Sequence, residues 1–297
     1  MDATVQTKPL ISIRSSATVQ EAAQLMADCS IAALGILDKD HLFAGIVTER
    51  DLSWFVAQGK DAVETTVENI TNDFPVVVEG PIEDSAAIER MRKARVRHLI
   101  VHEADDFRIV SMRDYVLRTP GKELAENPSA RDLMTAPAVA CREEAFFEEV
   151  AEILADRDIS GMPVVDRDSR VVGVISERDL AYALGGPMVR LALRRRSARP
   201  LHGVGELPRG VRRARDIMTT PALTVPGDAH LDDIARLMRL HQVNRVPVVD
   251  DHRLIGVVTR GDILGAIGHV EHSAIDLSSP PVLVGSAGLN PARGTHE

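Results

Sequence analysis

A serine or threonine followed three residues later by an aspartate ends four short apolar segments of the chain, and each copy opens a segment that favours a helix. The four copies are Thr48-Glu-Arg-Asp51, Ser111-Met-Arg-Asp114, Ser176-Glu-Arg-Asp179 and Thr259-Arg-Gly-Asp262. At a helix N-terminus this spacing lets the hydroxyl and the carboxylate cap free backbone N–H groups. The same place, at the positive end of the helix dipole, also suits contact with an anionic ligand.

Two features bear on the choice between capping and ligand contact. The third helical residue is Asp in all four copies, whereas a reciprocal capping box prefers the longer Glu or Gln. Glycine precedes the hydroxyl residue by three positions in three copies, as Gly45, Gly173 and Gly256, which indicates a close approach of backbone or ligand. The second copy has Arg108 there, which either supplies charge to a phosphate or closes a pocket by its bulk. Capping and binding are compatible, and both interpretations stay open.

The four copies belong to a longer repeat, because their aspartates are 63, 65 and 83 residues apart. Ahead of each copy, residues at positions i, i+3, i+4 and i+7 predict a helix with one buried face. These positions are Val19, Ala22, Ala23 and Met26, then Asp84, Ala87, Ile88 and Met91, then Phe147, Val150, Ala151 and Leu154, and finally Leu231, Ile234, Ala235 and Met238. Asp84 takes the first apolar position in the second repeat. Thr18-Val-Gln-Glu21 predicts a capping box for the first helix.

The spacing also predicts the strands of each unit. An apolar strand is expected to begin twelve residues after the first helix position, at Ile31, Val96, Ile159 and Val243. An opening strand is expected after Lys8-Pro9, Asp73-Phe74, Ala136-Pro137 and Thr220-Pro221. Each unit is then strand, helix, strand, strand, helix, which is a mixed α/β (α+β) fold. Since a unit of about 60 residues is marginal alone, we expect the units to form two pairs.

The spacing of these predicted helices and strands gives the expected domain boundaries. They are repeat 1 at 1–60, repeat 2 at 61–121, repeat 3 at 127–187, a basic linker at 188–210, repeat 4 at 211–270 and a tail at 271–297. The tail is rich in Ser, Pro and Gly and is expected to be disordered. The linker belongs to a segment, 190–215, with nine arginines and one acid, Glu206. We expect an exposed connector; a docking segment for nucleic acid or an acidic partner is the alternative, weakened by the lack of aromatic residues.

Composition excludes several classes of protein. The 297 residues carry a net charge of −9 with 44% hydrophobic residues, which is typical of a soluble globular protein and argues against nucleic-acid binding by the whole surface. No apolar run reaches membrane-helix length and no secretory signal is visible, so we expect a cytoplasmic protein without membrane contact. Cys29 and Cys141 fit no disulfide, zinc or redox spacing. His269 and His272 lack further ligands and indicate an exposed helix end rather than a metal site.

The repeats resemble those of the CBS-domain family, which pair into Bateman modules. The resemblance rests on the four Ser/Thr-x-x-Asp endings together with Asp132-Leu-Met-Thr-Ala-Pro137, Asp216-Ile-Met-Thr-Thr-Pro221, Met162-Pro-Val-Val-Asp166 and Val246-Pro-Val-Val-Asp250. It covers about residues 5 to 270 and is strongest in repeats 3 and 4. Gly35-Ile36-Leu37 and Ile100-Val101 replace Pro-Val-Val in the first two. In this family, clefts between paired repeats commonly bind AMP, ADP, ATP or S-adenosylmethionine, and occupancy regulates a partner.

The resemblance implies which residues line such clefts. The carboxylates of Asp51, Asp114, Asp179 and Asp262 would accept the ribose hydroxyls, while Thr48, Ser111, Ser176 and Thr259 would face ribose or phosphate. Nucleotide-binding members place a His-Arg pair before the mid-repeat Pro-Val. That place holds Asn244-Arg245 in repeat 4, Arg97-His98 in repeat 2, Ala32-Ala33 in repeat 1 and Ser160-Gly161 in repeat 3. We therefore rank the fourth cleft first and the second cleft next.

The arginines also have another interpretation. Arg97 and Arg245 either contact phosphate or are solvated or paired with an acid. Arg50, Arg113 and Arg178 precede the Asp and are further candidates, but first-turn arginines usually point to solvent.

The leading hypothesis is a regulatory module that senses adenine nucleotides and signals to an unidentified protein through changed packing of its repeats. The alternatives are an interaction scaffold with degenerate clefts and an S-adenosylmethionine sensor. No enzyme is expected, since no nucleophile elbow, P-loop or dinucleotide motif is present, and no cofactor is required beyond the regulatory nucleotide. Assembly of two chains stays open.

Overall fold

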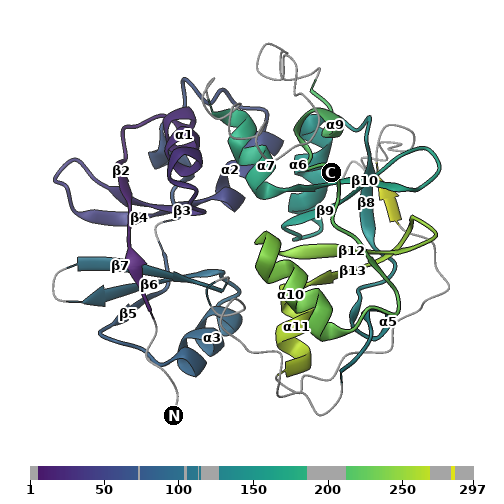
Figure 1. Cartoon of the computed structure of the whole chain (residues 1–297). Helices are drawn as coiled ribbons and strands as arrows, with labels where there is room; N and C mark the ends of the chain where they lie inside the picture. The colour runs from purple at the N-terminus through teal and green to yellow at the C-terminus, as the bar shows by residue number, and fades with distance from the viewer. Residues whose placement is uncertain are drawn as a thin grey trace, which may run out of the picture.

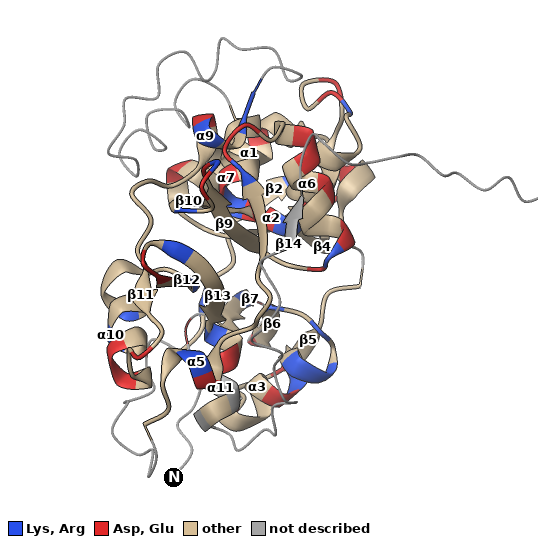
Figure 2. Ribbon diagram, turned by 90° about the vertical axis from the view of Figure 1, so that its right-hand side faces the viewer, with Lys and Arg blue, Asp and Glu red and all other residues tan. Residues whose placement is uncertain are grey.

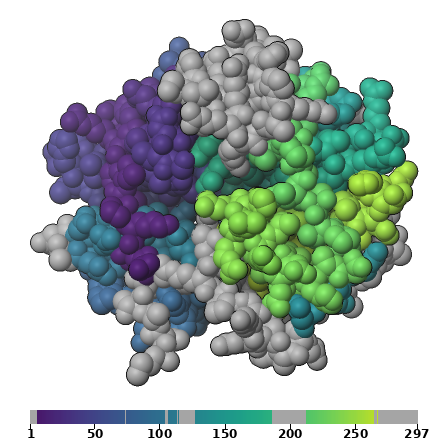
Figure 3. Space-filling view, in the orientation of Figure 1, coloured from purple at the N-terminus to yellow at the C-terminus, as the bar shows by residue number. Residues whose placement is uncertain are grey.

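The computed structural model describes residues 6–72, 74–103, 106–112, 114, 127–185, 212–267 and 282–284. Arg113, His269, His272 and the linker 188–210 lie outside these residues, so the expectations for them stay predictions. The described residues form four units that occupy four sectors of one body (Figures 1 and 3). A view turned by 90° has repeats 1 and 3 in its upper half and repeats 2 and 4 in its lower half (Figure 2).

Repeats 1, 3 and 4 contain the expected order of elements, and the described residues of repeat 2 contain its first four. Repeat 1 has β2 (Ser12–Arg14), α1 (Val19–Cys29), β3 (Ala33–Leu37), β4 (Phe43–Thr48) and α2 (Glu49–Ala57). Repeat 2 has β5 (Val77–Glu79), α3 (Asp84–Lys93), β6 (His98–Glu103) and β7 (Asp106–Ser111). Repeat 3 has β8 (Val139–Arg142), α6 (Phe147–Asp156), β9 (Gly161–Val165), β10 (Val171–Ser176) and α7 (Glu177–Leu184). Repeat 4 has β11 (Val225–Pro226), α10 (Leu231–His241), β12 (Arg245–Asp250), β13 (Arg253–Thr259) and α11 (Arg260–Ile267). The mixed α/β fold is therefore confirmed.

The sheets share one topology. In every repeat the first strand pairs in parallel with the second, which pairs antiparallel with the third. Two further strands lie at the edges: β1 (Lys8–Pro9) on β7, and β14 (Val282–Val284) on β8. Strand β14 lies within the tail expected at 271–297, and the rest of that tail lies outside the described residues, so the expectation for it stays a prediction.

The helices bury the predicted faces. All four apolar positions of α1 and the equivalent positions of α6 are buried, as are Leu231, Ile234 and Met238 of α10 and Ala87 and Met91 of α3. The capping box of Thr18 and Glu21 at the start of α1 is confirmed, since each side chain bonds the backbone N–H of the other.

The strands that follow these helices begin two residues later than predicted. Each helix is followed by a residue with left-handed φ, at Ser30, Arg95, Asp158 and Gln242. The N–H of the next residue then bonds a carbonyl in the last turn: Ile31 to Met26 at 3.0 Å, Val96 to Met91 at 2.9 Å, Ile159 to Leu154 at 3.1 Å and Val243 to Met238 at 3.1 Å. This is a Schellman motif, in which the apolar residue packs back on the helix. The four apolar residues therefore cap helices and do not begin strands.

Segments that open one repeat lie against the hairpin of its partner. Pro9 pairs with Arg108, and Ile46 bridges to Asn72, which joins repeats 1 and 2. Thr135 bridges to Val257, and Val174 to Thr219, which joins repeats 3 and 4. The repeats therefore form the two expected pairs, 1 with 2 and 3 with 4.

This packing explains the recurrent glycine. A Cβ on Gly45 would lie 2.5 Å from the carbonyl oxygen of Asn72, and one on Gly173 or Gly256 would overlap a methionine side chain of the partner's opening segment. The close approach is thus made by protein, not by ligand. Arg108, which replaces this glycine in the second repeat, bonds the hydroxyl and carbonyl of Thr7 through its guanidinium, and both expected roles for it stay predictions.

The two pairs meet through the helices of repeats 1 and 3. Helix α2 packs against α6 and α7, and α1 packs against α7. Their buried residues, among them Phe55 and Leu180, form one continuous apolar cluster across both repeats. Repeats 2 and 4 have separate apolar clusters within the described part of the chain. No helix among the described residues is long and apolar enough to cross a membrane.

Gly45→Ala is expected to lower the free energy of unfolding by about 1–3 kcal/mol. The added Cβ would meet a backbone carbonyl of the partner repeat, and Gly45 has φ +154. Chemical denaturation measures the loss. Gly261→Ala is the control, because this exposed helical glycine has only ordinary contacts, and it should leave stability unchanged or raise it. Equal stability of Gly45→Ala and the parent protein would contradict the steric explanation.

Candidate functional site

All four Ser/Thr-x-x-Asp copies cap a helix in the same way. One oxygen of each aspartate, Oδ2, accepts hydrogen bonds from both the backbone N–H and the hydroxyl of the Ser or Thr. The two distances are 2.7 and 2.7 Å at Thr48, 3.0 and 2.6 Å at Ser111, 2.9 and 2.6 Å at Ser176, and 2.7 and 2.6 Å at Thr259. Asp132 caps Ser129 identically at the start of helix α5 (Ala130–Leu133). Asp is therefore long enough for this box, and its recurrence does not by itself indicate a ligand.

The second carboxylate oxygen distinguishes the four aspartates. Asp114 Oδ1 accepts a hydrogen bond from Lys8 Nζ at 2.5 Å. Asp179 is only 2% exposed and faces the Thr219 hydroxyl at 3.5 Å. Asp51 and Asp262 are partly exposed, and within the described part of the chain no hydrogen bond to their Oδ1 is present. The Oδ1 atoms of Asp51 and Asp262 are therefore available to accept ribose hydroxyls. The equivalent oxygen of Asp114 is already bonded, and that of Asp179 is buried.

Strand register places the expected cationic positions beside the caps. Thr259 pairs across the hairpin with Arg245, and Ser111 pairs with His98. The carbonyls of Asn244 and Arg97 accept the N–H of the first helical residue that follows, at 3.1 and 2.9 Å. The structure therefore brings the two predicted pairs to the N-termini of the predicted helices.

Arg245 is a buried cation that reaches from repeat 4 into repeat 3. Its residue is 8% exposed, and Nη2 donates to Ser160 Oγ at 2.5 Å. The guanidinium lies over Gly161, where a Cβ would overlap it. Burial lowers the pKa of Arg245 to about 10, with the charge of Glu177 opposing and that of Arg97 assisting the shift. The side chain is therefore still cationic at neutral pH.

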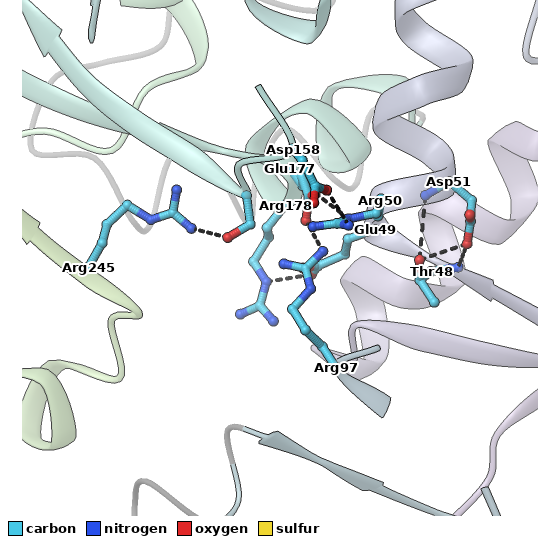
Figure 4. A network of polar contacts seen from close by, with 10 residues as sticks. Thr48, Glu49, Arg50, Asp51, Arg97, Asp158, Glu177, Arg178 and Arg245 are labelled. Atoms are coloured by element: carbon cyan, nitrogen blue, oxygen red, sulfur yellow. Dashed lines mark hydrogen bonds and ion pairs between the residues drawn. The ribbon is translucent and has the colours of Figure 1, made fainter. Parts of the chain in front are cut away.

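Two glutamate–arginine pairs connect the helices of repeats 1 and 3 (Figure 4). Arg50 Nε donates to Glu177 at 3.1 Å, and Arg178 Nε donates to Glu49 at 2.6 Å. The pairs are reciprocal: in each helix a Glu-Arg dipeptide follows the capping residue, and its Glu accepts from the Arg of the other helix. The side chains of Arg50 and Arg178 are only 27% and 20% exposed. The expectation that these first-turn arginines point to solvent is wrong.

Arg97 of repeat 2 also pairs with Glu177. Its Nη2 donates to Glu177 Oε2 at 2.5 Å, so a carboxylate of repeat 3 holds arginines of both repeat 1 and repeat 2. Pairing with an acid was one of the two interpretations of Arg97. Arg50 makes a further ion pair with Asp158 at 2.7 Å.

The sequence reasoning missed Glu49 and Glu177. The available signal is that repeats 1 and 3 both carry Glu-Arg between the capping residue and the Asp, whereas repeat 2 has Met-Arg and repeat 4 has Arg-Gly. Burial raises the pKa of the Glu49 carboxyl, and Arg178 opposes this shift.

His98 is held neutral at this site. Burial, assisted by the charges of Arg97 and Arg178 and opposed by Asp114, lowers the pKa of His98 to about 4. Burial alone would raise the pKa of Asp114, but hydrogen bonds from Lys8 and Ser111 outweigh it and lower that pKa.

A cavity of about 540 Å³ lies elsewhere. Its lining residues are Arg131, Thr224, Pro226, Gly227, Asp228, Val249, Asp250, Asp251 and His252. Arg245 and Asp250 are the two ends of β12, about 16 Å apart along an extended strand. The cavity therefore lies at the far end of the strand from the Arg245–Thr259 cleft.

A family model for the CBS domain matches residues 3–57, 130–186 and 214–269, more than half of the chain. The chain belongs to the CBS-domain family. The matched regions leave out repeat 2, which the structure shows to have the same order of strands and the same preceding helix. Four CBS repeats therefore follow from the sequence match and the fold together.

Two curated relatives each match about half of the chain. An uncharacterized protein of Methanocaldococcus jannaschii, MJ1426, is 32% identical over an alignment of 151 residues that covers 46% of this chain and 89% of the relative. Hypoxic response protein 1 of Mycobacterium tuberculosis is 31% identical over 135 residues, which are 46% of this chain and 82% of the relative.

A solved structure is similar over almost the whole chain. The crystal structure of protein MJ1225 from M. jannaschii has a TM-score of 0.71 and 20% identity, and the match covers 88% of this chain and 97% of that protein. At this identity the similarity shows the fold, and it extends to all four repeats.

Acid is expected to destabilise the protein through His98. Between pH 6.5 and about 4 the unfolded chain binds a proton at His98 that the folded chain does not, so stability falls as pH decreases through this window. The shift corresponds to about 3 kcal/mol once the pH is below both pKa values. Urea unfolding of the parent protein and His98→Gln at pH 7.0 and 4.5 measures the difference. Identical pH dependence in the two proteins would contradict a His98 that is neutral in the folded protein.

Proposed function

We propose that this chain is a regulatory module that binds an adenine nucleotide, AMP, ADP or ATP, in the cleft of repeat 4. The observation that carries the proposal is the combination of Asp262 and Arg245 at one helix N-terminus. Asp262 keeps one carboxylate oxygen for ribose hydroxyls, and Arg245 is a buried cation whose one hydrogen bond between described residues goes to a neutral hydroxyl. Membership of the CBS-domain family supports the choice of an adenine nucleotide.

Arg245 suits a phosphate for an electrostatic reason. Its charge is removed from water without a carboxylate partner among the described residues, and an unpaired buried charge is costly. A phosphate would provide a charged acceptor for its remaining N–H groups. The free energy of that pairing favours binding of an anionic ligand over a neutral one.

The second cleft ranks below the fourth. Asp114 is paired with Lys8, Arg97 is paired with Glu177, and His98 is neutral. A nucleotide there would have to break two ion pairs before making its own. The third cleft ranks lowest, because Asp179 is covered.

The contacts of Arg245 suggest how occupancy is signalled. Arg245 bonds Ser160, and the carbonyl of Ser160 accepts the N–H of Glu177, the first residue of α7. Helix α7 in turn packs on α2 of the other module. A phosphate that draws Arg245 away from Ser160 would act on this interface, by no more than its differential affinity for the two arrangements. An unidentified protein partner would respond to the changed packing.

Calorimetric titration of the full chain with AMP, ADP, ATP and S-adenosylmethionine tests the proposal. Asp262→Asn is expected to weaken nucleotide binding about tenfold or more, because the amide keeps one acceptor for Thr259 but cannot accept ribose hydroxyls with its nitrogen. Asp132→Asn is the matched control, since Asp132 makes the same cap outside the cleft, and it should not change affinity.

The outcomes separate the candidate functions. No heat from any ligand at millimolar concentration would contradict nucleotide sensing and favour a scaffold. If only S-adenosylmethionine binds, the regulatory ligand is S-adenosylmethionine and not a nucleotide. Nucleotide binding that survives Asp262→Asn unchanged would show that the cleft is wrongly assigned.

A further inference from the structure

Glu177 is the most deeply buried of the glutamates and arginines whose ion pairs join repeats 1, 2 and 3. It is 4% exposed, and its carboxylate accepts hydrogen bonds from Arg50 of repeat 1 and Arg97 of repeat 2 while belonging to repeat 3 itself. Figure 4 shows the arginines converging on it from different parts of the chain. Three of the four repeats therefore meet at one carboxylate.

Glu49 occupies the equivalent position of repeat 1 but has a simpler role. It is the first residue of α2, as Glu177 is of α7, and it forms an ion pair with Arg178 at 2.6 Å. One arginine for each glutamate would suffice to join the two helices. The contact with Arg97 is what distinguishes Glu177 from Glu49 among the ion pairs of the described residues.

A carboxylate and a phosphate are alternative partners for the same guanidinium. The Arg97 side chain is 39% exposed, so a ligand can reach it from solvent. Glu177 also acts on Arg245, since its negative charge favours the charged form of that arginine. The two arginines expected to meet phosphate are therefore both within the electrostatic influence of Glu177.

We propose that Glu177 determines how many negative charges the module accepts in a ligand, because its carboxylate occupies Arg97 as an internal anion. This inference rests on the proposed nucleotide function and concerns a nucleotide in the cleft of repeat 2, to which Arg97 belongs and which ranks below the cleft of repeat 4. A bound phosphate has to share or take Arg97 from Glu177, and each additional phosphate adds repulsion from the carboxylate. Glu177 thereby weakens binding of ATP more than binding of AMP, and it leaves adenosine unaffected.

The test compares Glu177→Gln with the parent protein in titrations with adenosine, AMP and ATP. The amide keeps the shape of the side chain but removes its charge. AMP affinity is expected to rise about tenfold and ATP affinity by more, while adenosine affinity stays constant. Glu49→Gln is the matched control: it removes an ion pair across the same interface but no hydrogen bond with Arg97, so any gain in AMP or ATP affinity should be much smaller than in Glu177→Gln.

Arg97→Gln provides an independent measurement in a protein that retains Glu177. Its nucleotide affinity should fall, for ATP more than for AMP, with adenosine unchanged. In Glu177→Gln combined with Arg97→Gln, the gain seen in the single glutamate variant should be lost. Thermal unfolding of Glu177→Gln and Glu49→Gln reports the loss of the interhelical ion pairs separately from affinity.

Several results would overturn the inference. If the parent protein binds AMP and Glu177→Gln binds AMP and ATP no better, Glu177 is a structural ion pair and the proposed nucleotide function still stands. An equal gain in Glu49→Gln, or an equal gain for adenosine and ATP, would also exclude a role through Arg97 and charge. Absence of nucleotide binding in the parent and in every variant would instead refute the nucleotide function itself, and this inference with it.

Discussion

The contact between the N-termini of α2 and α7 is the constraint on which the two modules depend. Two helix N-termini that approach each other bring together partial positive charges. Asp51 and Asp179 cap these ends, and Glu49 and Glu177 then accept hydrogen bonds from arginines of the opposite helix. Breaking one partner of a buried ion pair leaves an uncompensated charge, which costs several kcal/mol. The reciprocal pairs therefore fix which faces of the two modules meet, in addition to the apolar packing below them.

The same constraint joins the ligand clefts to the module interface. Arg97 and Arg245 come from repeats 2 and 4, yet their polar contacts are with Glu177 and Ser160, two residues of repeat 3 that are themselves connected through a backbone hydrogen bond. A new anion near either arginine changes the balance of charge at the start of α7. Since α7 packs on α2, a ligand bound as proposed would act on the interface between modules. This is the physical basis on which binding and packing of the repeats can be coupled.

The sequence predicts what is local and repeats. The buried positions Val19 and Met26 follow from helical periodicity, and the caps follow from spacing. The strands begin later than predicted because Ser30 and its equivalents adopt left-handed φ. None of these residues is glycine, so their residue types did not indicate this conformation. The direction of Arg50 could not be predicted, because its partner Glu177 is 127 residues away. Gly45 indicated a close approach, but only the fold shows that the partner repeat makes it.

The missing cation of repeat 3 has a steric explanation. Arg245 of repeat 4 lies over Gly161 of repeat 3, the residue at the equivalent position of the hairpin, and a Cβ there would overlap the guanidinium. Within this module a large side chain in one repeat therefore requires the smallest one in the other. Ala33 and His98 occupy the same two positions in the other module, again one small and one large. In repeat 3 the absence of a cation is thus what makes room for Arg245, and it does not by itself indicate decay of the cleft. Arg97 and Arg245 belong to different modules, and in the proposed function the charge of Glu177, which acts on both, would decide how strongly each binds a phosphate.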